Sequence, residues 1–188
     1  RTEPATSEEG IQLLEAEWMV SNKRINAFKV HPAFIRNGVE VDHIYVGAFE
    51  GCLFSASSND YLRNNEQTMD SNVDTLCSIS GVLPASGITQ QLNINNCRKL
   101  AANKGQGYGL FDFTVLSAIQ LLFLIEHASF DSQECIGIGN SNQGEVAIRT
   151  GENNDISVTY RRIENLWGNV MSWTEGININ LGYAYWSN

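Results

Sequence analysis

The chain has 188 residues, of which 43% are hydrophobic and 18% are charged, and these values are typical of one globular domain. A globule of this length buries about 70% of the surface that its unfolded chain exposes, so its core needs no disulfide or metal. The 21 acidic and 12 basic side chains give a formal net charge of −9. This charge disfavours nucleic acid as a partner. The longest apolar stretch, residues 115–125, is too short for membrane insertion.

Neither the start of the chain nor its cysteines determine the compartment. The chain begins at Arg1 rather than Met, so we expect a processed or excised piece, in which a missing signal peptide is uninformative. The cysteines include no C-x-x-C pair, which disfavours zinc and thioredoxin-like chemistry. Two disulfides in three connectivities remain open, but we favour buried free thiols, because free cysteine is usually buried. The four residues concerned are Cys52, Cys77, Cys97 and Cys135.

The N-terminal stretch contains a helix-start pattern. Thr6 and Glu9 fit the N-cap and N3 positions of a capping box. A short amphipathic helix is therefore predicted, with apolar residues at helical spacing. These are Ile11, Leu14 and Trp18.

The dipeptide Asn37-Gly38 predicts a hairpin, because both central residues of a type I′ turn need positive φ and these two tolerate it. Its strands would be residues 33–36 and 39–46. Residues 51–91 are rich in Ser, Asn, Asp and Gly and show no sustained periodicity. We therefore expect a long irregular loop there, which carries function or decoration, rather than a linker between domains.

Two helices are expected in the middle of the chain. Residues 92–103 fit a helix with Asn93 or Asn95 as N-cap and Gly105 as terminator. Residues 114–128 are apolar nearly all round, as in a helix buried on several sides, so this helix should form the centre of the core. The apolar face of the first helix would carry Cys97, Leu100 and Ala101.

Short strand-like segments separated by Gly and Asn turns follow the second helix and predict antiparallel hairpins. They are residues 136–139, 145–149 and 156–160. The chain has no internal repeat and no Pro-rich linker. The expected architecture is therefore α+β.

No residue pattern requires catalysis or a cofactor. Glycines at 105–109 and 137–139 lack the strand–helix context of a dinucleotide loop and are interpreted as turns. Residues 140–142 and 153–155 offer oxygen ligands for calcium, but the full motif is missing, so Asx-rich turns are favoured. We therefore expect no catalytic residue, no metal and no cofactor. Histidines without zinc-ligand spacing, interpreted as surface or core residues, are His31, His43 and His127.

The segment Tyr160–Ile179 holds two tryptophans and a Gly-Asn turn among apolar residues. Trp167, Val170 and Trp173 are spaced by three, so packing between elements is favoured over ligand contact. Side chains able to hold the loop backbone by hydrogen bonds are Glu164, Asn165 and Asn169.

Parts of this segment and of the second helix resemble known families. Residues 163–173 resemble the N-x-x-G-N-V-W-E-W segment of the formylglycine-generating (sulfatase-modifying) branch of the C-type lectin fold, and residues 93–128 resemble its pair of framing helices. Residues 160–179 and 117–126 are closer still to the C-terminal regions of bacteriophage and prophage tail and receptor-binding proteins. There, Y-R-G-I-E-N-x-x-G-N-x-W-x-x-x-D-G-I-N-I recurs beside S-A-x-Q-L-L-F-L-I-E. The resemblance implies a C-type lectin-like domain at 28–188, after a helical or extended lead-in at 1–27.

The chain departs from these patterns at several positions. Arg162, Met171 and Glu175 stand where the phage pattern has Gly, Trp and Asp. The formylglycine-generating enzymes need two cysteines near their C-terminal end, whereas no cysteine follows Cys135. The Glu-Pro-Asn and Trp-Asn-Asp calcium motifs of lectins are also missing. The resemblance therefore implies neither the enzymatic activity nor calcium-dependent sugar binding.

What the resemblance implies is a non-enzymatic module on a phage or prophage virion surface, extracellular when acting, that recognises a bacterial surface glycan or protein. It also implies contact with other virion subunits and a homo-oligomer, whose multiple copies raise a weak single-site affinity. The alternative is a purely structural virion protein that decorates the particle or joins other subunits.

The ligand-binding candidates come from related hypervariable ligand-binding proteins, in which the last segment of the fold forms the contact surface. Tyr, Trp and Asn provide rigid contact area and adaptable hydrogen bonds at interfaces. The same residues also fit a final strand that packs on the core. The candidates are Asn180, Tyr183, Tyr185, Trp186 and Asn188.

Overall fold

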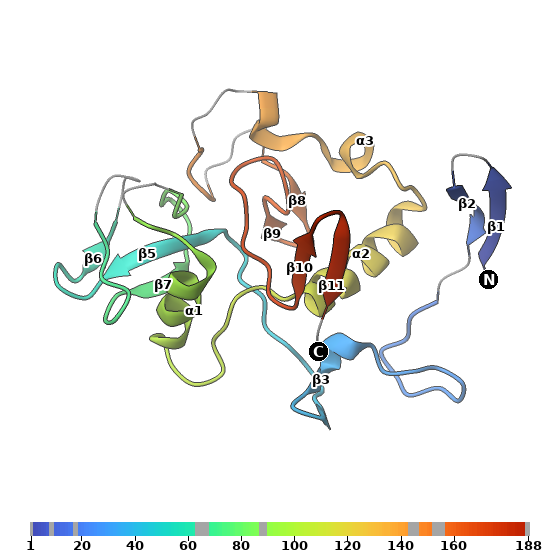
Figure 1. Cartoon of the computed structure of the whole chain (residues 1–188), viewed down its shortest axis with the longest axis horizontal. Coiled ribbons are helices and arrows are strands. Elements are labelled where there is room, and N and C mark those ends of the chain that lie inside the picture. The colour runs from blue at the N-terminus through green and yellow to red at the C-terminus, as the bar shows by residue number, and fades with distance from the viewer. Residues whose placement is uncertain are drawn as a thin grey trace.

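The computed structural model describes residues 2–7, 10–16, 19–62, 68–86, 90–142, 147–151 and 157–186. These residues form a mixed fold of helices and small antiparallel sheets, so the α+β class is confirmed (Figure 1). The helices are α1 (Ile94–Ala102), α2 (Phe113–His127) and α3 (Ser132–Ile136), with 3-10 turns η1 (Pro32–Phe34) and η2 (Gly139–Asn142). The strands are β1 (Thr2–Ser7), β2 (Gly10–Ala16), β3 (Ile35–Arg36), β4 (Val39–Glu40), β5 (Gly51–Ser55), β6 (Asp60–Tyr61), β7 (Thr75–Ser78), β8 (Thr159–Tyr160), β9 (Ile163–Glu164), β10 (Ile177–Asn180) and β11 (Tyr183–Trp186).

A three-stranded sheet in the order β6-β5-β7 lies beside α1 (Figure 1). Side chains alternate across a strand, so neighbours on β5 enter different apolar clusters. One cluster contains Cys52, Cys77 and Val82. The other contains Leu53, Leu62 and, from α1, Leu100. The expectation of a long irregular loop at 51–91 is therefore wrong where β5, β6 and β7 form. These strands have two to five residues each, which is too short for a recognisable periodicity in the sequence, and they form because they pair with one another.

Helix α2 carries the largest apolar cluster. Val115, Ile119 and Phe123 are buried one turn apart and pack with Ala33 and Tyr160. The predicted helix at 114–128 is confirmed to within one residue, as is its place in a core. The rest of its apolar surface is mostly half-buried.

Helix α1 follows its sequence signals closely. The side chain of Asn93 accepts a hydrogen bond from the Asn96 amide, so the first of the two predicted N-caps is the one used. The predicted apolar face is confirmed by the buried residues Cys97, Leu100 and Ala101.

The turn at Asn37-Gly38 is confirmed. Both residues take positive φ, 52° and 77°, as a type I′ turn requires. The strands are shorter than predicted: β3 and β4 have two residues each, and residues 33 and 34 belong to η1 instead.

The predicted N-terminal helix is wrong, because β1 and β2 form an antiparallel hairpin with Thr6 opposite Ile11. Gly10 would lie in the first turns of that helix, where it costs about 1 kcal/mol relative to Ala. Pro4 lies at an irregularity in the strand register, a position at which a strand tolerates proline.

The strands predicted after α2 are mostly wrong. Residues 132–136 form α3, whose N-cap Asp131 accepts a hydrogen bond from the Glu134 amide, and residues 139–142 form η2. Residues 147–149 are not in a strand, while 145–146 and 156 lie outside the described residues. Only 159–160 pair, as β8 with β9.

All four cysteines are free thiols, as expected. Cys52, Cys77 and Cys97 are buried, and Cys135 is half-buried.

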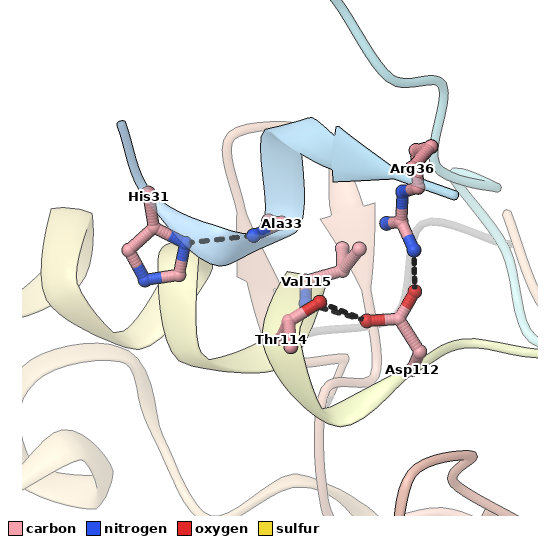
Figure 2. A network of polar contacts seen from close by, with 6 residues as sticks. All are labelled: His31, Ala33, Arg36, Asp112, Thr114 and Val115. Atoms are coloured by element: carbon pink, nitrogen blue, oxygen red, sulfur yellow. Dashed lines mark hydrogen bonds and ion pairs between the residues drawn. The ribbon is translucent and has the colours of Figure 1, made fainter. Parts of the chain in front are cut away.

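Asp112 connects the N-terminus of α2 to β3 (Figure 2). Its carboxylate accepts hydrogen bonds from the Thr114 hydroxyl (2.5 Å), the Val115 amide (2.9 Å) and the Arg36 guanidinium (2.6 Å). Burial alone would raise the pKa of Asp112, but these hydrogen bonds together lower it below its usual value. The ionised carboxylate therefore stabilises the folded chain.

We predict that Asp112→Ala lowers the free energy of unfolding by about 2 kcal/mol at neutral pH, because α2 loses its N-cap and Arg36 loses its partner. Asp112→Asn keeps the capping oxygen and should cost less than half as much. Because the folded-state pKa is depressed, the charge of Asp112 stabilises above the unfolded value of 3.8 and ceases to do so as the pH falls through the folded value. The difference between wild type and Asp112→Asn in urea unfolding should therefore vanish in acid; a pH-independent difference would contradict this assignment.

Candidate functional site

The ligand-binding candidates lie on the C-terminal hairpin, formed by β10 and β11. Leu181 and Gly182 take positive φ of 49° and 82°, so a two-residue type I′ turn joins the strands. Across the hairpin, Asn180 is opposite Tyr183. This register determines which candidates lie together.

The hairpin has two unlike faces, because side chains alternate along a strand and opposite residues share a face. The Tyr/Asn face comprises Asn178, Asn180, Tyr183 and Tyr185. The Ile/Trp face comprises Ile177, Ile179, Ala184 and Trp186. The structure thus brings three candidates together, places Trp186 on the opposite face, and leaves Asn188 outside the described residues.

Both faces of the hairpin reach solvent. Tyr183 is 70% exposed, Tyr185 57% and Trp186 70%. All four side chains of β11 are exposed, so the alternative of a final strand that packs on the core is wrong for the described chain.

The base of the hairpin is fixed to both long helices. The Glu175 amide donates to the Phe111 carbonyl (3.0 Å), and the Glu175 carbonyl accepts from the Phe113 amide (2.8 Å) at the start of α2. The Arg98 guanidinium on α1 forms a two-point ion pair with the Glu175 carboxylate. The hydrogen bonds from Arg98 lower the pKa of Glu175. Sequence reasoning missed this link, since Arg98 and Glu175 are 77 residues apart.

The two tryptophans before the hairpin behave differently. Trp167 is half-buried, stands edge-on to Phe123 of α2, and donates from Nε1 to the Gly137 carbonyl (2.9 Å). Trp173 is 49% exposed and donates from Nε1 to the Leu92 carbonyl (2.8 Å). The packing interpretation is therefore confirmed for Trp167. Trp173 instead links the segment that precedes β10 to the residues just before α1.

A half-buried carboxylate, Glu50, organises the loop that leads to the hairpin. It accepts hydrogen bonds from the Asn165 side chain (3.0 Å), the Asn169 side chain (2.5 Å) and the Val170 amide (3.3 Å). Burial raises the pKa of Glu50, against the opposing effect of these donors. The same Asn169 amide group also bonds both backbone groups of Ile148.

The predicted bonding of loop backbone is confirmed for Asn169 and for Glu164, whose carboxylate accepts a hydrogen bond from the Gly151 amide (2.9 Å). The Asn165 side chain instead bonds the Glu50 carboxylate and not loop backbone among the described residues. Glu50, more than a hundred residues away, had no local sequence signal.

The glycine of the Trp-Gly-Asn sequence in this loop is required sterically, because another loop backbone lies against it. Gly168 has a φ of +83°, and a Cβ added there would come within 2.5 Å of the Ile138 carbonyl oxygen. The facing Gly139 is equally crowded, since its Cβ would lie 2.9 Å from the Cα of Gly168. Only glycine allows these two loop backbones to approach so closely.

The end of α2 carries a titratable cluster. Glu126 accepts hydrogen bonds from the Arg161 guanidinium and from the Tyr160 hydroxyl (2.6 Å). The Arg161 hydrogen bond lowers the pKa of Glu126 to about 2. Burial, together with the bond to Glu126, raises the pKa of Tyr160 to about 12. Neither group exchanges a proton near neutral pH, so this cluster suits a structural link better than acid–base chemistry.

The histidines do not converge. The Ala33 amide donates to Nδ1 of His31 (Figure 2), and burial lowers the pKa of His31. His43 stands edge-on to Tyr45, and His127 stacks on Phe123. Within the described ranges, no three His, Cys, Asp or Glu side chains are grouped as metal ligands.

The two Asn-rich stretches considered for calcium are only partly described. Residues 140–142 belong to η2, and residues 153–155 lie outside the described part of the chain. No helix among the described residues is long and apolar enough to cross a membrane.

The chain matches no family model, no curated protein and no solved structure. Its function therefore has to be inferred from its own residues.

We predict that Glu50→Ala lowers the free energy of unfolding by about 2–3 kcal/mol, because the donors of Asn165, Asn169 and Val170 lose their acceptor. Glu134→Ala, which removes an exposed carboxylate on α3, is the matched control and should change it by less than about 0.5 kcal/mol. Urea unfolding of both variants measures the difference. Equal effects would show that the Glu50 hydrogen bonds contribute nothing net.

Proposed function

We propose that this chain is a non-enzymatic binding module of C-type lectin-like architecture, displayed on the surface of a phage or prophage virion, that recognises a bacterial surface glycan or protein. The observation that carries the proposal is the exposed Tyr/Asn face of the C-terminal hairpin on a base held by α1 and α2. The motif resemblance of residues 117–126 and 160–179 supports the virion assignment.

The chemistry of the Tyr/Asn face suits recognition without catalysis. Tyr183 and Tyr185 offer two rigid rings that contribute contact area at low conformational-entropy cost. Asn178 and Asn180 lie beside them and carry amides that both donate and accept hydrogen bonds. A face of this composition fits the apolar ring faces and hydroxyl groups of a glycan, and also a polar protein surface.

The rest of the fold suits a scaffold for such a face. Loops that carry function are normally positioned by rigid elements, and here the hairpin base is bonded to the N-terminus of α2 and to α1. The order of α1 and α2, followed by a long loop that side chains hold in place, supports the proposal of a C-type lectin-like architecture. Several copies in a homo-oligomer, attached to other virion subunits, would raise a weak single-site affinity.

A purely structural virion role is the second candidate, and the Ile/Trp face favours it. Ile179 is 71% exposed and Trp186 70% exposed, and both point to the same side of the hairpin. Exposed apolar side chains that adjoin one another mark contact sites between proteins. In this case the hairpin would join another virion subunit.

We predict that changing Tyr183 and Tyr185 together to Ala weakens adherence to bacterial cells roughly tenfold or more, because buried aromatic anchors dominate interface energetics. The measurement uses fluorescently labelled, multimerised chain on a panel of strains, with and without enzymatic removal of surface glycans. Both side chains are exposed, so the melting temperature should be unchanged. Tyr108→Ala is the matched control, because Tyr108 is also 57% exposed but lies between α1 and α2.

Different outcomes separate the two candidates. Adherence lost on glycan removal supports a carbohydrate receptor, and adherence that survives it supports a protein receptor. Undiminished adherence of the double variant would refute the Tyr/Asn face as the site. A wild-type chain that adheres to no strain but forms a stoichiometric complex with a virion protein, lost in Trp186→Ala, would establish the structural role.

A further inference from the structure

Two buried thiols face each other across the β5–β7 pair. Cys52 is directly opposite Cys77 in the antiparallel register. The carbonyls on either side of Cys52 point away from β7: Gly51 accepts from the Ala85 amide (2.7 Å) and Leu53 from the Leu62 amide (2.8 Å). Because successive residues alternate in direction, Cys52 turns its own backbone groups toward β7.

This geometry is compatible with a covalent bridge. Opposite residues that exchange backbone hydrogen bonds in an antiparallel pair have Cα atoms about 5.5 Å apart. Disulfide-bonded cysteines most often have Cα atoms about 5.5–6 Å apart and Cβ atoms about 3.5–4.5 Å apart. Opposite Cβ atoms in a sheet are about 4.5–5.5 Å apart, so closing the bridge requires the two strands to approach by roughly 1 Å at this position. The other two thiols do not share a strand pair, because Cys97 lies on α1 and Cys135 on α3.

We propose that Cys52 and Cys77 are an oxidisable pair that closes into a cross-strand disulfide when the folded chain meets a small-molecule disulfide oxidant. The inference depends on the strand register and not on the function proposed above.

The two sulfurs are inequivalent, which orders the reaction. Cys77 is 9% exposed and Cys52 fully buried. Burial raises the pKa of Cys52 to about 11, so it is a thiol at neutral pH. The Lys104 ammonium donates a hydrogen bond to Cys77 Sγ (3.3 Å), and this bond raises the pKa of Lys104. Because Cys52 is fully buried, Cys77 is the sulfur that an oxidant can reach first, and the Lys104 ammonium lies beside it.

The reaction balances as two thiol–disulfide exchanges. The Cys77 thiolate attacks one sulfur of the oxidant, whose S–S bond breaks; one half leaves as a thiolate and the other stays on Cys77 as a mixed disulfide. The Cys52 sulfur then attacks Cys77 Sγ, and its proton passes to the half of the oxidant that departs. The mixed disulfide breaks and the second half leaves. Two protein thiols are oxidised to one disulfide, and one disulfide oxidant is reduced to two thiols.

The test compares two variants that keep one pair of cysteines each. Cys97→Ala/Cys135→Ala keeps the proposed pair, and Cys52→Ala/Cys77→Ala keeps the other two thiols. Each folded protein is incubated with oxidised glutathione, quenched in acid, and alkylated after unfolding, and its mass is measured. We expect the first variant to lose both alkylatable thiols and the mass of two hydrogens, without retained glutathione. The second should keep its thiols or carry glutathione adducts.

Wild-type protein supplies an independent measurement should a variant fail to fold. Proteolysis of the oxidised chain without reductant should release one crosslinked species that joins the Cys52 and Cys77 peptides. Oxidation should raise the melting temperature by roughly 5–10 °C, reversibly with reductant, because the bridge constrains the unfolded chain. Two thiols that both survive oxidant, a stable mixed disulfide on Cys77, or a crosslink to Cys97 or Cys135 would overturn the proposal.

Discussion

The carboxylate of Glu50 holds in place a part of the chain that has little regular structure of its own. Between α2 and β10 the described chain contains only α3, η2 and the two-residue strands β8 and β9. Loop backbone must still satisfy its polar groups, and side chains supply the partners. Glu50 binds the side chains of Asn165 and Asn169, and Asn169 in turn binds Ile148. These hydrogen bonds satisfy the polar groups of the loops, as the backbone hydrogen bonds between strands do in a sheet. Removing one partner would leave the other groups of the network unsatisfied.

The parts of the fold that sequence reasoning predicted correctly depend on residues close together in the chain. Asn93 caps α1 through the Asn96 amide three residues later, and the type I′ turn requires only Asn37 and Gly38 themselves. The apolar run of α2 is long enough to specify a helix by composition alone. In the candidate site, the three aromatic candidates of β11 follow from a family resemblance, and the local pattern leaves open whether their strand packs on the core; the exposure of β11 comes from the structure alone.

What could not be predicted depends on partners far away in sequence. The capping-box pattern at Thr6 satisfies a local rule, yet the segment pairs as a strand with Ile11 opposite, so pairing outweighs propensity. β5 forms a strand because it pairs with β7. The two faces of the β10–β11 hairpin depend on the strand register that its turn sets. Nothing near Arg98 in the sequence indicates Glu175, although this pair anchors the hairpin.

The arrangement separates the residues that hold the hairpin from those available for contact. The bonds of Glu175 to Phe111, Phe113 and Arg98 lie at its base, while the rings of Tyr183 and Tyr185 extend beyond it into solvent. An isolated two-stranded hairpin is only marginally stable, so the base must supply the order that its four-residue strands cannot. A preorganised hairpin loses little conformational freedom when a partner covers it, which leaves more of the contact energy as affinity. The exposed residues can therefore vary while the fold is retained, which is what the proposed recognition of a receptor would require.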